Sequence, residues 1–187
     1  MDIKEIIKEI KDFLNSTFEK VDLWFDKEAE LRSYKPKSGG WTINQILEHI
    51  GLTNYYLLIL IDKGTKKALS NINNLDLQEE LKGYEFHRKK LTEVGLHKSF
   101  NWIRPEHMEP KAEKNIQQVR QQIKEQVLQC LDTLEKLKNG EGVLYKTTMT
   151  VNNLGKIDVY EYIYFLAQHG QRHITQMEKN EIEFKNE

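Results

Sequence analysis

The chain has 187 residues, of which 28 are Lys or Arg and 29 are Asp or Glu, so its formal net charge at pH 7 is −1. This balance leaves no excess positive charge for a phosphate backbone, and we expect no nucleic-acid partner. Hydrophobic residues make up 39% of the chain and charged residues 30%, a composition typical of a globular protein and not of a disordered or fibrous one. The length suits one core, so we expect residues 1–187 to form a single domain.

The cysteine content and the chain's apolar runs predict a compartment. Cys130, the single cysteine, cannot close an intramolecular disulfide, and its apolar neighbours predict a small core residue. The N-terminal MDIKEIIKEI carries acidic residues from its second position, unlike a basic secretion signal. The longest apolar run, Tyr55 to Ile61, is far below the roughly 18–20 residues that span a bilayer. We therefore expect a cytoplasmic protein with no membrane partner.

The first half of the chain predicts two helices. Apolar residues at spacings of three and four predict an amphipathic helix from the N-terminus that continues, with a bend, toward Leu31: Ile3, Ile6, Ile7, Ile10, Phe13 and Leu14. A loop is expected from Ser33 to Gly40, around Pro36. Thr42 followed by Gln45 then matches a capping box, which opens a central helix that we expect to end at Asp62 to Gly64.

The second half predicts two further long helices. Between them and the central helix, Thr65 to Lys111 is an insertion in which Leu75 to Leu91 can form one helix. A sustained apolar stripe predicts a helix over Asn115 to Lys138. Leu144 to Ile157 is rich in Thr and Val and predicts an irregular or extended loop, with room for a short hairpin. Asp158 and Glu161 form an acidic capping pair that opens the last helix.

Two histidines stand four residues apart on the last predicted helix. His169 and His173 therefore lie on one helix face, where two imidazoles can reach one ion. Chance alone produces such pairs, and a solvated helix face is the simpler explanation. The same face, however, carries Tyr162, Phe165 and Leu166, which are expected to point inward. Histidines on a face that points inward need polar partners.

A third histidine, His49, lies in the most apolar helix of the chain. Alone, such a histidine is more often a hydrogen-bonded core residue than a metal ligand. Together with His169 and His173 it would supply three protein ligands and leave coordination positions open, as in a catalytic metal site. Three neutral imidazoles would leave the charge of the ion uncompensated, so that a water molecule or a thiol is acidified there.

The segments GGWTINQILEHIGLTN and FLAQHGQRHITQMEK resemble the first metal-ligand segment and the closing H-x-x-x-H helix of DinB-like proteins, in the same order. The separation of the segments resembles the YfiT-type and thiol-transferase branch. The resemblance implies an all-α four-helix bundle with two long crossovers, frequent homodimers and a nickel or zinc site at His49, His169 and His173. It also implies either thiol S-transfer, with bacillithiol, mycothiol or glutathione as cosubstrate, or metal-dependent hydrolysis of a small-molecule substrate.

Other polar residues carry weaker predictions. Gln45, Thr53 and Gln176 lie within one turn of the candidate ligands and could orient them, although surface or cap roles are equally open. Glu48 is turned about 100° from His49 and is better explained as a solvated or inter-helix charge than as a general base. Two sets complete the predictions: surface residues His87, His97 and His107, and core residues Trp24, Trp41 and Trp102, of which one or two could line a pocket mouth.

Two classes of function therefore stay open. The first is a metal-dependent enzyme, a thiol-dependent transferase or a hydrolase, with the same three ligands in either case and no identified catalytic acid or base. The second is a non-catalytic, dimeric stress-response module whose helices are held together by the metal. A site with an open coordination position favours the first class, and a fourth protein ligand favours the second.

Overall fold

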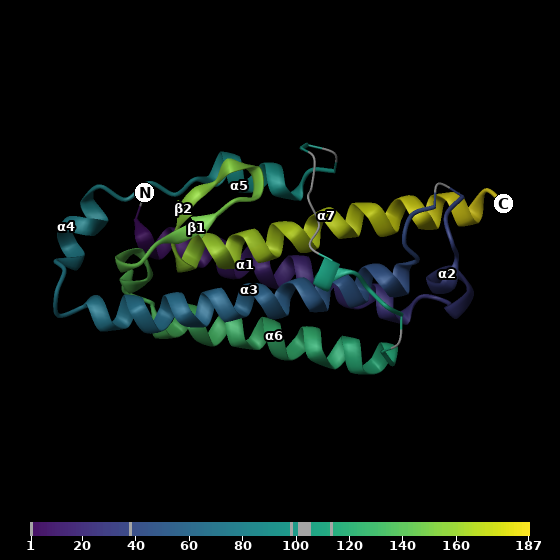
Figure 1. The fold of residues 1–187 in the computed structure, drawn as a ribbon, viewed down its shortest axis with the longest axis horizontal. Coiled ribbons are helices and arrows are strands. Elements are labelled where there is room, and N and C mark those ends of the chain that lie inside the picture. The colour runs from purple at the N-terminus through teal and green to yellow at the C-terminus, as the bar shows by residue number, and fades with distance from the viewer. Residues whose placement is uncertain (1, 38, 98, 101–105, 113) are drawn as a thin grey trace.

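The computed structural model describes residues 2–187 except residues 38, 98, 101–105 and 113 and the side chain of residue 107. In this part of the chain, four long helices form a bundle: α1 (Ile3–Leu23), α3 (Ile43–Asn71), α6 (Ile116–Lys136) and α7 (Val159–Lys185). Helices α1 and α7 run in one direction along the bundle, and α3 and α6 run in the other (Figure 1). Both α1 and α3 pack against α6 and α7. The predicted all-α four-helix bundle is confirmed.

The bend expected after the first helix is present. Helix α1 ends at Leu23, a 3-10 turn follows at Trp24–Asp26, and α2 (Ala29–Ser33) begins after it. The Arg120 guanidinium of α6 donates to the carboxylates of Asp22, at the end of α1, and Asp26, in the 3-10 turn, at 2.8 and 2.7 Å. The end of α1 is thereby tied to the start of α6.

Helix α3 is longer than predicted. It begins as expected at Thr42, whose side chain forms the capping box with Gln45, but it continues past Gly64 to Asn71. Gly64 is buried, and a Cβ atom at this position would lie 3.0 Å from the Val159 side chain. Close packing against α7 therefore retains a glycine inside the helix, and Ala68 beyond it is also buried. The prediction that the helix ends at Asp62 to Gly64 is wrong, because tertiary packing outweighs the low helix propensity of glycine at this position.

The insertion contains two short helices where one was expected. Helix α4 (Leu77–Lys82) begins at Asp76, whose carboxylate accepts from the amides of Gln78 and Glu79. Helix α5 (Arg88–Gly95) packs along α7, outside the bundle (Figure 1). The prediction of one helix from Leu75 to Leu91 is wrong, since the chain turns at Gly83. A 3-10 turn at Glu106–Met108 then precedes α6.

The connection between α6 and α7 contains the short hairpin that the sequence allowed. A 3-10 turn at Glu141–Leu144 leads into strand β1 (Thr147–Met149), which pairs antiparallel with β2 (Gly155–Ile157) around a 3-10 turn at Val151–Asn153. Both flanking helices begin at a side-chain cap, of which the sequence predicted the one at Asp158. Asn115 caps α6, and Asp158 forms a capping box with Glu161 at the start of α7.

Buried residues from all four long helices form the core, and Cys130 is among them, as predicted. Burial raises the pKa of the Cys130 thiol to about 12. Within the described residues, no helix is both long enough and apolar enough to cross a bilayer.

Candidate metal centre

The structure brings the three predicted histidines together. His49 lies in the second turn of α3, and His169 and His173 lie on the facing side of α7. One ligand nitrogen from each side chain can be chosen so that all three atoms lie within 4.8 Å of one another. The Nε2 atoms of His169 and His173 are 3.0 Å apart. Within the described residues, this is the one group of three or more His, Cys, Asp or Glu side chains that could hold a metal ion.

In two of the rings, a hydrogen bond from Nδ1 defines which nitrogen is left to point into the site. His49 donates from Nδ1 to the Met108 carbonyl oxygen, at 2.7 Å. His173 donates from Nδ1 to Oε1 of Gln176, at 2.9 Å. Because Nδ1 carries the hydrogen in both neutral rings, both Nε2 atoms keep a lone pair for an ion. Such a second hydrogen bond is the usual companion of a metal-ligating histidine, so the residues present fit a divalent metal.

The electrostatics of the site favour neutral imidazoles. Burial, together with His173 and His49, holds the pKa of His169 well below its ordinary value, and burial together with His49 lowers the pKa of His173 to about 3. Only neutral imidazole can ligate a metal. His169 and His173 are therefore neutral at pH 7 and carry no second proton that a metal would have to displace. The ring of Trp41 lies against that of His49, with centroids 4.6 Å apart, so Trp41 lines the site.

Of the residues proposed to orient the ligands, two contact them. Gln176 binds His173, and the hydroxyl of Thr53 lies 3.4 Å from Nε2 of His49. The side-chain Oε1 of Gln45 instead accepts from the Thr42 backbone amide in the capping box.

Glu48 was misjudged as a solvated or inter-helix charge. Its side chain is buried, and its carboxylate accepts from the backbone amides of Lys111 and Ala112, at 3.3 and 2.8 Å. The sequence carried no signal for this contact, because the donors are backbone groups more than 60 residues away.

The histidines of the insertion are not simple surface residues. His87 is half-buried, and its amide and its Nδ1 both donate to the buried carboxylate of Glu161, at 2.9 and 2.7 Å. His97 is also half-buried and lies close enough to His173 to lower the pKa of that residue. The surface prediction therefore holds only in part for both, and the side chain of His107 lies outside the described residues.

Of the other predicted tryptophans, Trp24 is buried, and Trp102 belongs to the segment that the structure does not describe.

A basic side chain adjoins the site as well. The Arg172 guanidinium donates to the Leu96 carbonyl and lies over the Phe100 ring, 5.8 Å from its centroid. Leu96 and Phe100 are thereby held against α7 next to the histidines.

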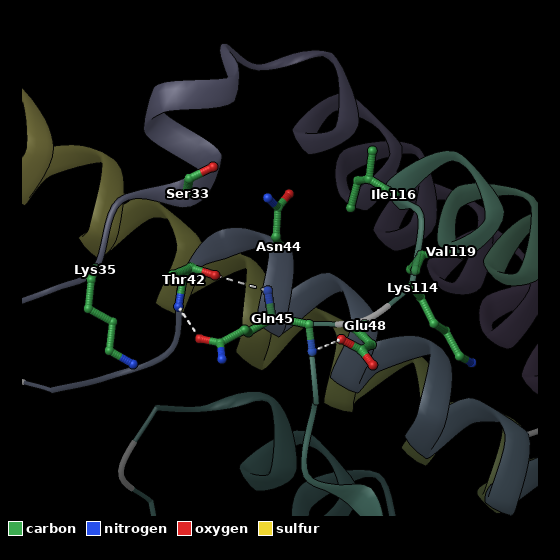
Figure 2. A pocket seen from close by; sticks show the side chains of 10 residues that line it. Ser33, Lys35, Thr42, Asn44, Gln45, Glu48, Lys114, Ile116 and Val119 are labelled. Carbon is green, nitrogen blue, oxygen red and sulfur yellow. Dashed lines mark hydrogen bonds between the residues drawn. The ribbon is translucent and has the colours of Figure 1, made fainter.

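A pocket of about 470 Å³ opens beside the start of α3. Figure 2 shows Thr42, Gln45 and Glu48 along the start of α3, with Lys114, Ile116 and Val119 of the α6 entry on the Glu48 side. The pocket thus borders the neighbours of His49 in the sequence.

A four-helix bundle whose facing helices present three buried histidines to one point defines a class of potential metal-binding proteins. The family model of the DinB superfamily matches residues 14–177. This range covers most of the chain and all three histidines, and the protein belongs to the DinB superfamily. Searches of curated proteins and of solved structures found no match.

Proposed function

We propose that this protein is a metal-dependent enzyme in which His49, His169 and His173 hold one nickel or zinc ion. The observation that carries the proposal is the three-imidazole group without a fourth His, Cys, Asp or Glu in it, within the described residues. Structural zinc sites are closed by four protein ligands, whereas catalytic sites keep a position open. The buried imidazoles of His169 and His173 are neutral at pH 7, so a metal would not have to displace a second proton from them.

The proposed reaction is transfer of a low-molecular-weight thiol, of the bacillithiol, mycothiol or glutathione type, to an electrophilic small molecule; hydrolysis of a small-molecule substrate is the second possibility. When bound, the ion would lower the pKa of a thiol or a water molecule and so supply a nucleophile at neutral pH. The chain's own part is to fix the ligands. Met108 and Gln176 orient two imidazoles, and Trp41 covers one side of His49.

One observation favours the non-catalytic alternative. The three histidines are between 2% and 6% exposed, and they join α3 to α7. An ion held there would stabilise the packing of these two helices whether or not it took part in a reaction. The two functions predict the same ligands and differ in whether a small molecule reaches the ion.

Two measurements test the proposal. Protein purified without a histidine tag is analysed for metal and titrated with Ni²⁺ and Zn²⁺ after chelation; we expect about one equivalent to bind, and uptake below a tenth of an equivalent would refute the site. The metal-loaded protein is then assayed with the three thiols against a panel of electrophiles, and with ester and amide substrates without thiol. Turnover that disappears with His169→Ala supports an enzyme, and tight metal binding without any turnover supports the structural alternative.

Three further features are part of the proposal: residues 1–187 as one domain, a homodimer in solution, and a cytoplasmic location. Sedimentation of the metal-free and metal-loaded protein tests the second, with a mass of twice 22.2 kDa expected.

A further inference from the structure

The chain entering α6 is fastened to the start of α3 by three hydrogen bonds. Met108 accepts from His49 Nδ1, while Lys111 and Ala112 donate their amides to the two carboxylate oxygens of Glu48. Figure 2 shows a dashed hydrogen bond that ends on the Glu48 carboxylate. Adjacent residues on α3 therefore bind the same short stretch of chain, residues 108–112, one through a ring and the other through a carboxylate.

The Glu48 carboxylate is suited to hold this stretch in one conformation. The side chain is only 6% exposed, and a buried charge needs hydrogen-bond donors to offset its loss of hydration. Bonds between a carboxylate and backbone amides are stronger than bonds between neutral groups. Ala112 has a φ of 57°, in the left-handed region, which costs an L-residue about 1–2 kcal/mol. The hydrogen bonds from the Lys111 and Ala112 amides to Glu48 offset this cost, so the carboxylate selects the backbone turn.

The turn at Ala112 decides where Met108 lies, because Met108 and Ala112 are four residues apart in the same stretch. With the amides of Lys111 and Ala112 held, the Met108 carbonyl stays on His49 Nδ1. This carbonyl can only accept, so it keeps the hydrogen on Nδ1 and leaves the lone pair on Nε2. Without it, the His49 ring would lose both its preferred tautomer and one restraint on its orientation.

We propose that Glu48 is a positioning residue for the metal ligand His49, acting through the 108–112 stretch. The inference rests on the proposed function in so far as His49 binds a metal. The contacts themselves, and the tautomer that they impose, belong to the metal-free protein and are open to separate measurement. Glu48 is thus neither a general base nor a surface charge in this assignment.

The experiment compares the parent with Glu48→Ala, Glu48→Gln and the control Glu125→Gln, which changes an exposed carboxylate on α6. Two readouts use protein freed of metal with a chelator: hydrogen exchange of the amides of Met108, Glu109, Lys111 and Ala112, and the ¹⁵N shifts of the His49 ring, which report the tautomer. The third readout is the Kd for Ni²⁺ and Zn²⁺. Loss of a group that orients a metal ligand typically weakens metal binding by about 10–100-fold.

We expect Glu48→Ala to speed exchange at Lys111 and Ala112, to mix the His49 tautomers and to weaken metal binding by about tenfold or more. Glu48→Gln keeps one acceptor oxygen and should fall between Glu48→Ala and the parent, whereas Glu125→Gln should match the parent. Glu48→Gln also serves as the test if Glu48→Ala does not fold. Unchanged exchange, an unchanged tautomer, or a Kd within twofold of the parent in both Glu48 variants would overturn the assignment. If the parent binds no metal, the proposed function fails, and exchange and tautomer still decide whether Glu48 positions His49.

Discussion

Nε2 of His173 lies 3.0 Å from Nε2 of His169, one helical turn earlier on α7. Since Nδ1 of His173 donates to Gln176, Nε2 of His173 carries a lone pair, and in the metal-free protein His169 must donate to it. A cation could take the place of that hydrogen only if His169 carried its hydrogen on Nδ1 instead, which would leave a lone pair on both Nε2 atoms. The pair is therefore stable with either one shared hydrogen or a metal, and it is unstable when both rings are protonated.

The metal-free protein should lose stability on acidification because of this pair. The pKa values of His169 and His173 are depressed in the folded state, whereas an unfolded histidine titrates near 6.5. Between the folded pKa and about 6.5 the unfolded chain binds more protons, so the free energy of unfolding falls as pH falls through this window. Each histidine contributes up to about 1.4 kcal/mol per pH unit there.

Urea unfolding at pH 7.5, 6 and 5 of protein freed of metal with a chelator measures this effect, with His173→Leu as the comparison. The variant lacks one of the two depressed groups, so its stability should rise relative to the parent as pH falls. A stability difference between the two proteins that is constant across this range would contradict the depressed pKa of His173.

A carboxylate at the start of α7 should give the opposite pH dependence. Asp158 is fully buried beside Glu161, and both burial and the neighbouring charge raise the pKa of Asp158 above its ordinary value. A raised pKa means that the folded state holds the proton more tightly, so this contribution is present at low pH and is lost as pH rises through the folded pKa. Asp158→Asn, which keeps an acceptor for the Glu161 amide, should gain stability relative to the parent between pH 4 and pH 8.

The control is Asp158→Ala, which removes the acceptor together with the charge. Loss of an N-cap costs about 1 kcal/mol, so this variant should be less stable than Asp158→Asn at every pH. Equal stability of the two variants would show that the cap contributes nothing, and a pH-independent gain in Asp158→Asn would show that the carboxyl does not titrate in this range.

Patterns local in the sequence predicted much of the fold and the candidate site. The capping boxes at Thr42 and Asp158 placed the starts of the two helices that carry the histidines, and those starts are confirmed. The spacing of His169 and His173 and the position of His49 on an apolar helix, together with the resemblance to DinB-like proteins, predicted the group of three that the structure shows.

Features that depend on contacts between distant segments were missed. Helix α3 passes Gly64 because that glycine fits against Val159, about 95 residues later. Glu48 bonds to backbone amides, and side-chain patterns do not report on these. Likewise, nothing near His87 indicates that Glu161, 74 residues away, accepts from both its amide and its ring. The Glu48 and His87 pairings depend on how the insertion folds over the bundle, and the Gly64 contact depends on how α3 packs against α7.

Gly142 provides a test of packing at the end of the bundle where α7 begins. A Cβ atom at residue 142 would lie 2.7 Å from the ring of Tyr160, which is fully buried and whose hydroxyl accepts from the Gly142 amide. A rigid ring cannot move aside as a flexible side chain can, so Gly142→Ala should cost about 1–3 kcal/mol of unfolding free energy. Gly83→Ala is the matched control, since nothing lies within 4 Å of a Cβ atom there and φ is negative. Chemical denaturation measures both, and a Gly142→Ala variant as stable as Gly83→Ala would contradict the close contact.

The last prediction separates the histidine that we assign to metal from one that binds a carboxylate. A ligand that binds only the folded state stabilises it by RT ln(1 + [L]/Kd), about 2.7 kcal/mol at a hundredfold excess over Kd. Metal should therefore raise the Tm of the parent. His49 is the one ligand contributed by α3, so His49→Ala leaves a two-point site on α7 and should lose most of this increment.

His87→Ala should behave differently, because its ring bonds to Glu161 near the start of α7 and not to the metal ligands. Removing the ring takes a donor from a buried carboxylate, so the metal-free Tm should fall while the metal increment stays close to that of the parent. Thermal melts of the parent and both variants, with chelator and with Ni²⁺ or Zn²⁺, give the two quantities independently. A full increment in His49→Ala would return His49 to the role of a hydrogen-bonded core histidine, and a lost increment in His87→Ala would mean that the start of α7 is coupled to the histidines in its middle.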